Sequence, residues 1–226
     1  MKVLRSVINL LLFSSLLFIA TSCLEGKGNY QTMQGLTGSV VAIDGIKYFR
    51  SDNGYLFKST EFNSYQVNDR LMASFTVNYD NQVSSSYYTV TEVYANKFPL
   101  LNITEIENDA ADTVFSKDPL AGMEAHYIST QGSNIYLTLY SYYVGSSKDH
   151  TPVLIYNDAQ QTNSDTLKLE YRIDKNGETG TTTYYNLTSF DLTNILNQKP
   201  SKTIQVKYNF LSNYYYYSYT NPLYSN

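Results

Sequence analysis

Hydrophobic and polar residues alternate with a period of two along most of the chain beyond residue 35. The clearest examples are RLMASFTVNYD at 70–80, TLKLEYRID at 166–174 and KTIQVKYNF at 202–210. Successive side chains of a β-strand point to opposite faces, so each segment predicts a strand with one buried face and one solvated face. One-sided burial of this kind is typical of antiparallel sheets.

Turn residues separate the predicted strands. Asp44-Gly45, Asp52-Asn53-Gly54 and Asn176-Gly177 supply the positive φ angles that tight hairpins need. No long segment has a helical period, and the best short helix lies at 191–196, where Asp191 can cap the first turn. We therefore predict an all-β fold.

An acidic and polar stretch, ENDAADTVFSKD at 107–118, interrupts the strand pattern near the middle of the chain. A short set of strands suits a small closed barrel, and a longer set suits two packed sheets. We therefore predict a small closed barrel at 36–108, which the resemblance described below implies is OB-like, a linker at 109–118 and an antiparallel β-sandwich at 119–226. A single larger sandwich is the alternative.

The first 22 residues have the pattern of a secretory signal peptide. Lys2 and Arg5 precede an apolar run at 7–20, and a basic start followed by a short apolar segment is typical of such signals. A membrane-spanning helix needs about 20 apolar residues, which is more than this run provides. We predict that residues 1–22 form a helical signal peptide that is cleaved on export.

Cys23 is the only cysteine of the chain, and it follows the signal directly. The small residues Ala20, Thr21 and Ser22 resemble the lipobox of bacterial lipoproteins, which implies that Cys23 is lipidated and becomes the new N-terminus. Residues 23–35 then form a flexible, lipid-anchored tether. The alternatives are a catalytic thiolate or half of an intermolecular disulfide. A nucleophilic cysteine normally needs a base, however, and neither histidine lies in a recognisable signature.

The residue after Cys23 bears on the membrane that the lipid enters. Leu24 occupies the position where an aspartate often marks retention in the inner membrane. The sequence therefore predicts an outer-membrane lipoprotein, which lies on the periplasmic face or on the cell surface. Its first partner is the membrane, which it reaches through the N-terminal lipid.

The composition argues against several classes of function. The formal net charge is −4 and no basic cluster is present, so nucleic acid is not an expected partner. No G-x-S-x-G motif occurs, and His126 and His150 lack further zinc ligands at metal spacing and are expected to be satisfied structural residues. The acidic residues fall mostly in predicted turns or on predicted solvated faces: Asp44, Asp52, Asp109, Asp112, Glu170 and Asp174. We expect no enzyme activity, no cofactor and no metal.

Tyrosine is unusually abundant, with 24 residues against 10 Phe and no Trp. Many of these tyrosines lie at 134–144 and 213–221. If these two strands are neighbours, one outer face carries a patch made of Tyr136, Tyr140, Tyr142, Tyr215, Tyr217 and Tyr219. Such rings suit sugars, peptides or another protein, although tyrosine also serves simply to cover a sheet.

Two short triplets match the Asp-Thr-apolar acceptor pattern of Bacteroidetes O-glycosylation, with Thr113 and Thr166 as the acceptor residues. Modification requires that the threonine is exposed after export. Thr113 is the better candidate because it lies in the predicted linker.

The order of these segments resembles the NigD-like family of Bacteroidetes lipoproteins. The segments that resemble its N-terminal half are GLTGSVVAIDGIKYFRSDNGYLFKS, NDRLMASFTVNYDN and YYTVTEVYANKFPLLNI, and those that resemble its C-terminal half are NIYLTLYSYYVG, TLKLEYRID and YYNLTSFDLTNIL. The resemblance covers nearly the whole mature chain. It implies an OB-type domain followed by a β-sandwich, and it brings no catalytic residues.

These observations favour a binding or structural role over catalysis. We expect an outer-membrane-anchored lipoprotein that acts as a non-catalytic module for a protein or envelope partner. The alternative is a non-catalytic glycan-binding lipoprotein that uses the tyrosine face.

Overall fold

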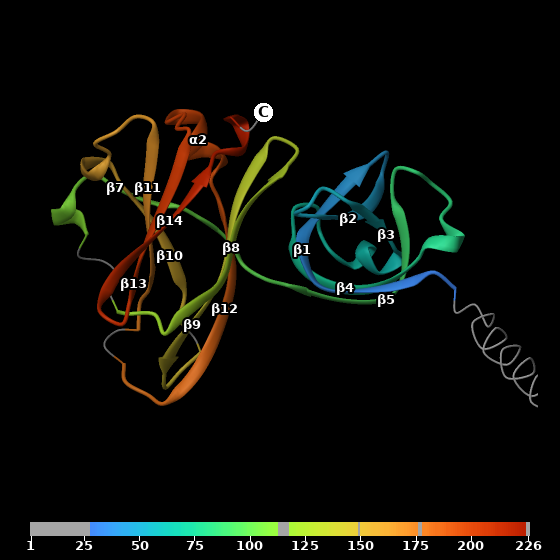
Figure 1. Ribbon diagram of the computed structural model, residues 1–226, viewed down its shortest axis with the longest axis horizontal. Helices are drawn as coiled ribbons and strands as arrows, with labels where there is room; N and C mark the ends of the chain where they lie inside the picture. Colours follow the sequence, from blue (N-terminus) through green and yellow to red (C-terminus); the bar gives the residue numbers. More distant parts are fainter. Residues whose placement is uncertain (1–27, 113–117, 149, 176–177, 225–226) are drawn as a thin grey trace, which may run out of the picture.

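The computed structural model describes residues 28–112, 118–148, 150–175 and 178–224. Figure 1 shows that the chain folds into two β domains, a closed barrel followed by a sandwich of two sheets. This confirms the predicted all-β fold. The predicted signal peptide, including Ala20, Thr21 and Ser22, lies outside the described residues, as do Cys23 and Thr113.

The barrel follows the predicted alternation closely. It consists of β1 (Tyr30–Ile43), β2 (Ile46–Ser51), β3 (Leu56–Lys58), β4 (Arg70–Asn78) and β5 (Tyr88–Lys97), in the spatial order β1-β2-β3-β5-β4. Asp44 and Gly45 have φ angles of 51° and 78°, as the predicted tight hairpin requires. The alternate residues of β4 that point inward are buried: Leu71, Ala73, Phe75 and Val77.

One glycine allows the barrel to close tightly. Gly38 of β1 pairs with both β2 and β4. A Cβ atom at Gly38 would overlap the Arg50 carbonyl oxygen and the Phe49 ring. The close approach of the two strands therefore depends on the absence of a side chain at this position.

The sandwich is built from two mixed sheets. The five-stranded sheet has the order β14-β13-β11-β10-β7, and the four-stranded sheet has the order β6-β12-β9-β8. The first contains β7 (Thr104–Ile106), β10 (Pro152–Asn157), β11 (Thr166–Ile173), β13 (Thr203–Phe210) and β14 (Asn213–Thr220). The second contains β6 (Leu100–Asn102), β8 (Gly122–Gln131), β9 (Asn134–Gly145) and β12 (Thr182–Asp191).

The prediction of a purely antiparallel sandwich is wrong in part. Three strand pairs are parallel: β10 with β7, β11 with β13, and β12 with β6. β11 and β13 lie side by side because the chain crosses to the other sheet through β12 between them. Side-chain alternation reports which residues are buried, and it carries no information on the direction of the neighbouring strand.

The domain boundary also differs from the predicted one. β6 and β7 lie within the range 36–108 that we assigned to the barrel, yet they pair with sandwich strands. The two domains therefore meet between β5 and β6. At the other end of the barrel, β1 begins at Tyr30, inside the predicted tether 23–35. Both segments pair with residues distant in the sequence, so local composition could not place them.

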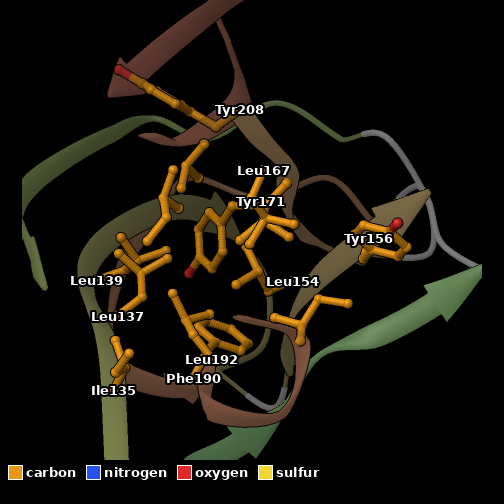
Figure 2. Close-up of a cluster of buried hydrophobic side chains, with 14 of the residues drawn as sticks. Ile135, Leu137, Leu139, Leu154, Tyr156, Leu167, Tyr171, Phe190, Leu192 and Tyr208 are labelled. Carbon is orange, nitrogen blue, oxygen red and sulfur yellow. The ribbon is translucent and has the colours of Figure 1, made fainter. Parts of the chain in front are cut away.

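The core of the sandwich consists of the inward residues of both sheets (Figure 2). The predicted inward sets of β11 and β13 are confirmed as buried: Leu167, Leu169, Tyr171, Ile173, Ile204, Val206 and Tyr208. A short helix, α2 (Thr193–Gln198), covers one end of the core with Ile195 and Leu196. The Asp191 carboxylate accepts a hydrogen bond from the Thr193 amide at 2.8 Å, close to the predicted cap. No helix among the described residues is long and apolar enough to cross a membrane.

A buried ion pair joins the two domains. Arg70 of β4 is fully buried, and its guanidinium donates two hydrogen bonds to the Asp52 carboxylate at 2.7 and 2.8 Å. From the sandwich, the hydroxyls of Ser189 and Thr138 accept hydrogen bonds from Arg70 at 3.0 and 3.1 Å. The Ser129 hydroxyl donates to Asp52 at 2.8 Å. The barrel is therefore attached to the four-stranded sheet by hydrogen bonds that reach across the interface.

This interface corrects one expectation about the acidic residues. Asp52 was expected to be a solvated turn residue, but its side chain is only 6 % exposed. Burial by itself would raise the pKa of Asp52, but the hydrogen bond and charge of Arg70 and the hydroxyls of Thr37 and Ser129 lower it below its ordinary value. The carboxylate therefore remains ionised inside the interface.

Candidate functional site

The predicted tyrosine face does not form. Strand β9 carries Tyr136, Tyr140 and Tyr142 in the four-stranded sheet, whereas β14 carries Tyr215, Tyr217 and Tyr219 in the other sheet. The two strands are therefore not neighbours, and their tyrosines belong to separate surfaces. Sequence spacing placed each set on one side of its own strand but could not show which strands pair.

The three tyrosines of β9 have different surroundings. Tyr136 is 1 % exposed and packs against the barrel, where its ring centre lies 5.0 Å from the Arg70 guanidinium. Tyr140 and Tyr142 remain half-buried on the outer face of the sheet. Their rings pack on Tyr185 of β12 at 5.7 and 5.6 Å. The exposed member of this small cluster is therefore Tyr185, which the sequence pattern did not single out.

The alternate tyrosines of β14 turn towards the interior of the sandwich. Tyr217 and Tyr219 pack against its core, and Tyr217 stacks on His126 with ring centres 3.4 Å apart. Tyr215, which is 44 % exposed, packs on Tyr208 at 5.8 Å. These residues cover the core at the open side of the sandwich, which is the structural role that we set against binding.

The two histidines have different surroundings. His150 lies 2.6 Å from the Glu178 carboxylate, as expected of a satisfied loop histidine. His126 differs from the expectation, because its Nδ1 atom is buried without a hydrogen-bond partner. Burial lowers the pKa of His126, which keeps the ring neutral between its aromatic neighbours. No group of three or more metal-binding side chains occurs among the described residues.

The strongest candidate site is a hollow on the outer face of the five-stranded sheet. It has a volume of about 620 Å³, within the usual range for ligand pockets of about 300–1,000 Å³. We call it the charged hollow and define it by Asp112, Thr162, Glu170, Arg172, Lys207 and Tyr216. Its residues come from β11, β13, β14 and the loops beside them.

The floor of the charged hollow is an ion-pair network. Arg172 donates hydrogen bonds to the two Asp112 oxygens at 2.5 and 2.8 Å, and its guanidinium lies 2.9 Å from Glu170. Lys207 approaches the same Glu170 carboxylate at 3.5 Å. The side chains of Asp112, Glu170 and Arg172 are between 3 and 10 % exposed. The expectation that Asp112 and Glu170 are solvated is therefore wrong.

The network holds the Arg172 guanidinium in its charged form. Burial by itself would lower the pKa of Arg172, but the hydrogen bonds and charges of Asp112 and Glu170 raise it above its ordinary value. Both carboxylates are held as ion-pair partners of Arg172. The Arg172 Nε atom is buried without a hydrogen-bond partner.

Aromatic rings form one rim of the charged hollow. Tyr216 lines it and is 57 % exposed. The neighbouring Tyr214 is 47 % exposed, and the Lys207 ammonium lies 3.8 Å from the centre of its ring. Exposed tyrosines beside fixed charges are typical of the residues that dominate protein interfaces.

Sequence reasoning missed the charged hollow because its residues were assigned to solvent. Lys168, Glu170 and Arg172 occupy every second position of β11 and therefore share one face of the strand. Opposite charges two residues apart on one strand face were the sequence signal that could have indicated an ion-pair network. No local pattern indicated that Asp112 packs over that face. Of the two O-glycosylation candidates, only Thr166 lies within the described residues. It is the first residue of β11 and is half-buried.

Comparison with known proteins supports the architecture. A family model for the NigD-like C-terminal beta sandwich domain matches residues 102–220. That range begins at the end of β6, close to the domain boundary in the structure. No curated protein matches the chain.

Solved structures with the same fold include three from Bacteroides species. A protein of unknown function from Bacteroides vulgatus has a TM-score of 0.68 at 17 % identity, covering 86 % of this chain and 92 % of that one. A lipoprotein candidate from Bacteroides fragilis has a TM-score of 0.60 at 15 % identity, with coverage of 84 % and 98 %. A NigD-like immunity protein from Bacteroides caccae has a TM-score of 0.51 at 12 % identity, with coverage of 86 % and 98 %. At these identities the likeness concerns the fold alone.

Proposed function

The chain belongs to the NigD-like family, and from that premise we propose that it is a lipid-anchored envelope protein that binds a protein partner without catalysing a reaction. The observation that carries this proposal is the charged hollow, with its paired charges and tyrosine rim. A partner that places polar groups beside the Lys207 ammonium and the Tyr216 hydroxyl would gain hydrogen bonds at a site that the buried Arg172 network holds in place.

The anchoring part of the proposal rests on the N-terminal sequence. The apolar run that ends in ATSC has the form of a lipoprotein signal, and a structural neighbour from Bacteroides fragilis is itself a lipoprotein candidate. We expect an outer-membrane location, on either the periplasmic face or the cell surface. Two or three acyl chains at Cys23 would anchor the protein stably, whereas one would not.

Metabolic labelling with a fatty-acid analogue tests the anchor. The wild-type chain should become labelled and should sediment with the outer-membrane fraction. Cys23→Ala should abolish the labelling and should release the protein from that fraction. Labelling that persists in Cys23→Ala would disprove the lipid assignment.

Partner binding can be tested by crosslinking in cells, followed by mass spectrometry of the tagged chain. Lys207→Glu reverses a charge at the floor of the charged hollow, so it should remove the partner's adduct. Lys97→Glu is the matched control, because Lys97 lies on the barrel and also contacts an acid, Asp69, at 2.6 Å. If the two variants keep the same adducts as the wild type, the charged hollow is not the binding site.

A glycan ligand is the second candidate, because Tyr216 offers an exposed ring beside the polar groups of the charged hollow. A glycan array with the full-length chain tests it. Tyr216→Ala should lose binding, while Tyr185→Ala should keep it. Tyr185 is also 57 % exposed but lies on the other sheet, so the two substitutions remove similar exposed rings. The absence of any bound glycan would reject this candidate.

A further inference from the structure

Strand β14 ends the five-stranded sheet. Within the described residues it pairs with β13 alone, and the pairing runs without a register shift from Phe210↔Asn213 to Thr203↔Thr220. Its eight residues, NYYYYSYT, include no charged residue, no proline and no glycine. An edge strand of this composition is a template for pairing with another strand.

The other edges of the described sheets are protected. β6 and β7 are only three residues long. β8 carries a register shift between Met123 and Ala125, with the exposed Glu124 at that point. The barrel is closed and has no edge. Short length, bulges and charges are the usual devices against strand addition, and β14 has none of them.

The backbone groups that β14 leaves free can be identified from its hairpin. Leu211 and Ser212 have φ angles of 47° and 66°, as in a two-residue turn that closes with a hydrogen-bonded pair, here Phe210 and Asn213. Hydrogen-bonded pairs then recur at every second residue. The Asn221 amide donates to the Lys202 carbonyl at 2.8 Å, which confirms the same alternation at the far end.

It follows that the odd-numbered residues of β14 turn their amides and carbonyls towards β13. The even-numbered residues turn these groups outward: Tyr214, Tyr216, Ser218 and Thr220. All four are exposed. A continuous row of hydrogen-bonding groups is therefore accessible along this edge.

We propose that the occupant of this edge is a second copy of the chain, with its β14 antiparallel to the first. The four outward residues are symmetric about position 217, so Tyr216 stands opposite Ser218 of the second copy and Tyr214 opposite Thr220. This single register pairs every outward amide and carbonyl of both strands. A two-fold axis relates the two copies, as in most soluble dimers.

The side chains fit the same register. Residues directly opposite each other share a face of the sheet, so each large outer tyrosine faces a small hydroxyl residue. β14 contains no charged residue, so the pairing of two copies places no like charges opposite each other. Tyr217 lies on the axis, where the two rings meet on the inner face. The two five-stranded sheets become one continuous sheet, which places both charged hollows on the same side.

This inference does not rest on the proposed partner, because it is argued from the backbone of β14, although the ring of Tyr216 also lines the charged hollow. Its register can be tested by cysteine crosslinking of the full-length chain in cells that express two differently tagged copies. Tyr216→Cys in one copy and Ser218→Cys in the other should give a disulfide-linked pair on oxidation, because a hydrogen-bonded pair has a Cα separation suitable for a disulfide. Either variant expressed alone in both copies should not. Cys23 is present in every sample, so any background that it causes is common to all. Equal crosslinking in all samples, or none, would overturn the proposed register.

A backbone substitution provides the second test. Ser218→Pro removes an outward amide and should be tolerated, because this amide does not pair with β13. Sedimentation of the detergent-solubilised full-length chain should show a dimer for the wild type and for Ser218→Ala. Ser218→Pro should weaken the dimer at least about tenfold, since the two-fold axis removes the amide from both strands. A monomeric wild type, or a dimer that Ser218→Pro leaves unchanged, would overturn the proposal.

Discussion

Replacing Arg70 by methionine is expected to destabilise the whole chain and not the barrel alone. Arg70 is 0 % exposed, and its guanidinium donates hydrogen bonds to Ser39, Asp52, Thr138 and Ser189. The guanidinium carbon lies 5.5 Å from the centre of the Phe98 ring and 5.0 Å from the centre of the Tyr136 ring. Methionine fills much of the same volume, but it carries no charge and can donate no hydrogen bond. The substitution therefore removes the ion pair and its hydrogen bonds without opening a large cavity.

The size of the effect follows from the group that is left behind. In Arg70→Met the Asp52 carboxylate stays buried and keeps only the donors Thr37, Ser129 and Gln131. Removing one partner of a buried ion pair typically costs about 3–5 kcal/mol. For a chain of this length we expect a fall in melting temperature of about 6–20 °C. Adding Asp52→Asn to Arg70→Met should restore part of the loss, because the unpaired charge is then gone.

The assay is urea denaturation followed by circular dichroism, with melting curves as a second measurement. Lys97→Met is the control, because Lys97 is 59 % exposed and its ion pair with Asp69 should contribute less than about 1 kcal/mol. If Arg70→Met costs no more than Lys97→Met, the buried ion pair does not hold the two domains together. If Asp52→Asn fails to recover any stability, the cost does not come from the unpaired carboxylate.

Three further predictions concern the same scaffold. Because the pKa of Asp52 is lowered from 3.8 in the folded protein, its contribution to stability is present above pH about 4 and should be lost as the pH falls through the folded pKa; urea titrations of the wild type should show this acid limb, and Asp52→Asn should flatten it. Gly38→Ala should cost at least about 1–3 kcal/mol in the same titrations, because the new methyl group meets the Arg50 carbonyl and the Phe49 ring; a neutral result would mean that β1 and β2 can separate. Arg172→Met should destabilise the sandwich by about 3–5 kcal/mol, because it removes the guanidinium that pairs with the buried carboxylates of Asp112 and Glu170, and a loss below about 1 kcal/mol would contradict this.

The sequence pattern predicted the longer strands and the residues of those strands that face the core. Leu71, Phe75, Leu169 and Val206 lie inside, as the alternation of β4, β11 and β13 predicted. Local turn chemistry also located the Asp44-Gly45 hairpin. These properties depend on a few neighbouring residues, so a single sequence contains them.

Properties that depend on distant residues were not predictable in the same way. The pairing of β6 and β7 with the sandwich, and the placing of β9 and β14 in different sheets, are set by contacts between segments far apart in the chain. The hairpin before β14 escaped notice because Leu211 and Ser212 adopt positive φ without Asn or Gly. The β14 edge could be analysed only once its neighbours were known.

The largest error in the functional prediction was the expected exposure of three acidic residues. Asp52, Asp112 and Glu170 were placed in solvent because an acid in a turn or on a polar strand face is usually exposed. Each is buried because a distant segment brings an arginine or covers the face. The interface between the domains and the charged hollow both arise from such pairs, so both were absent from the sequence prediction.

Site-specific photo-crosslinking in living cells is the most direct test of the central claim that the outer face of the five-stranded sheet binds a protein partner. A photo-reactive amino acid would be placed at Thr162 in the charged hollow and, as a control, at Tyr185 on the outer face of the other sheet. We expect one discrete adduct with another protein from Thr162, lost when Lys207→Glu is added, and no such adduct from Tyr185. The same adducts from both positions, or no adduct from Thr162, would contradict the account.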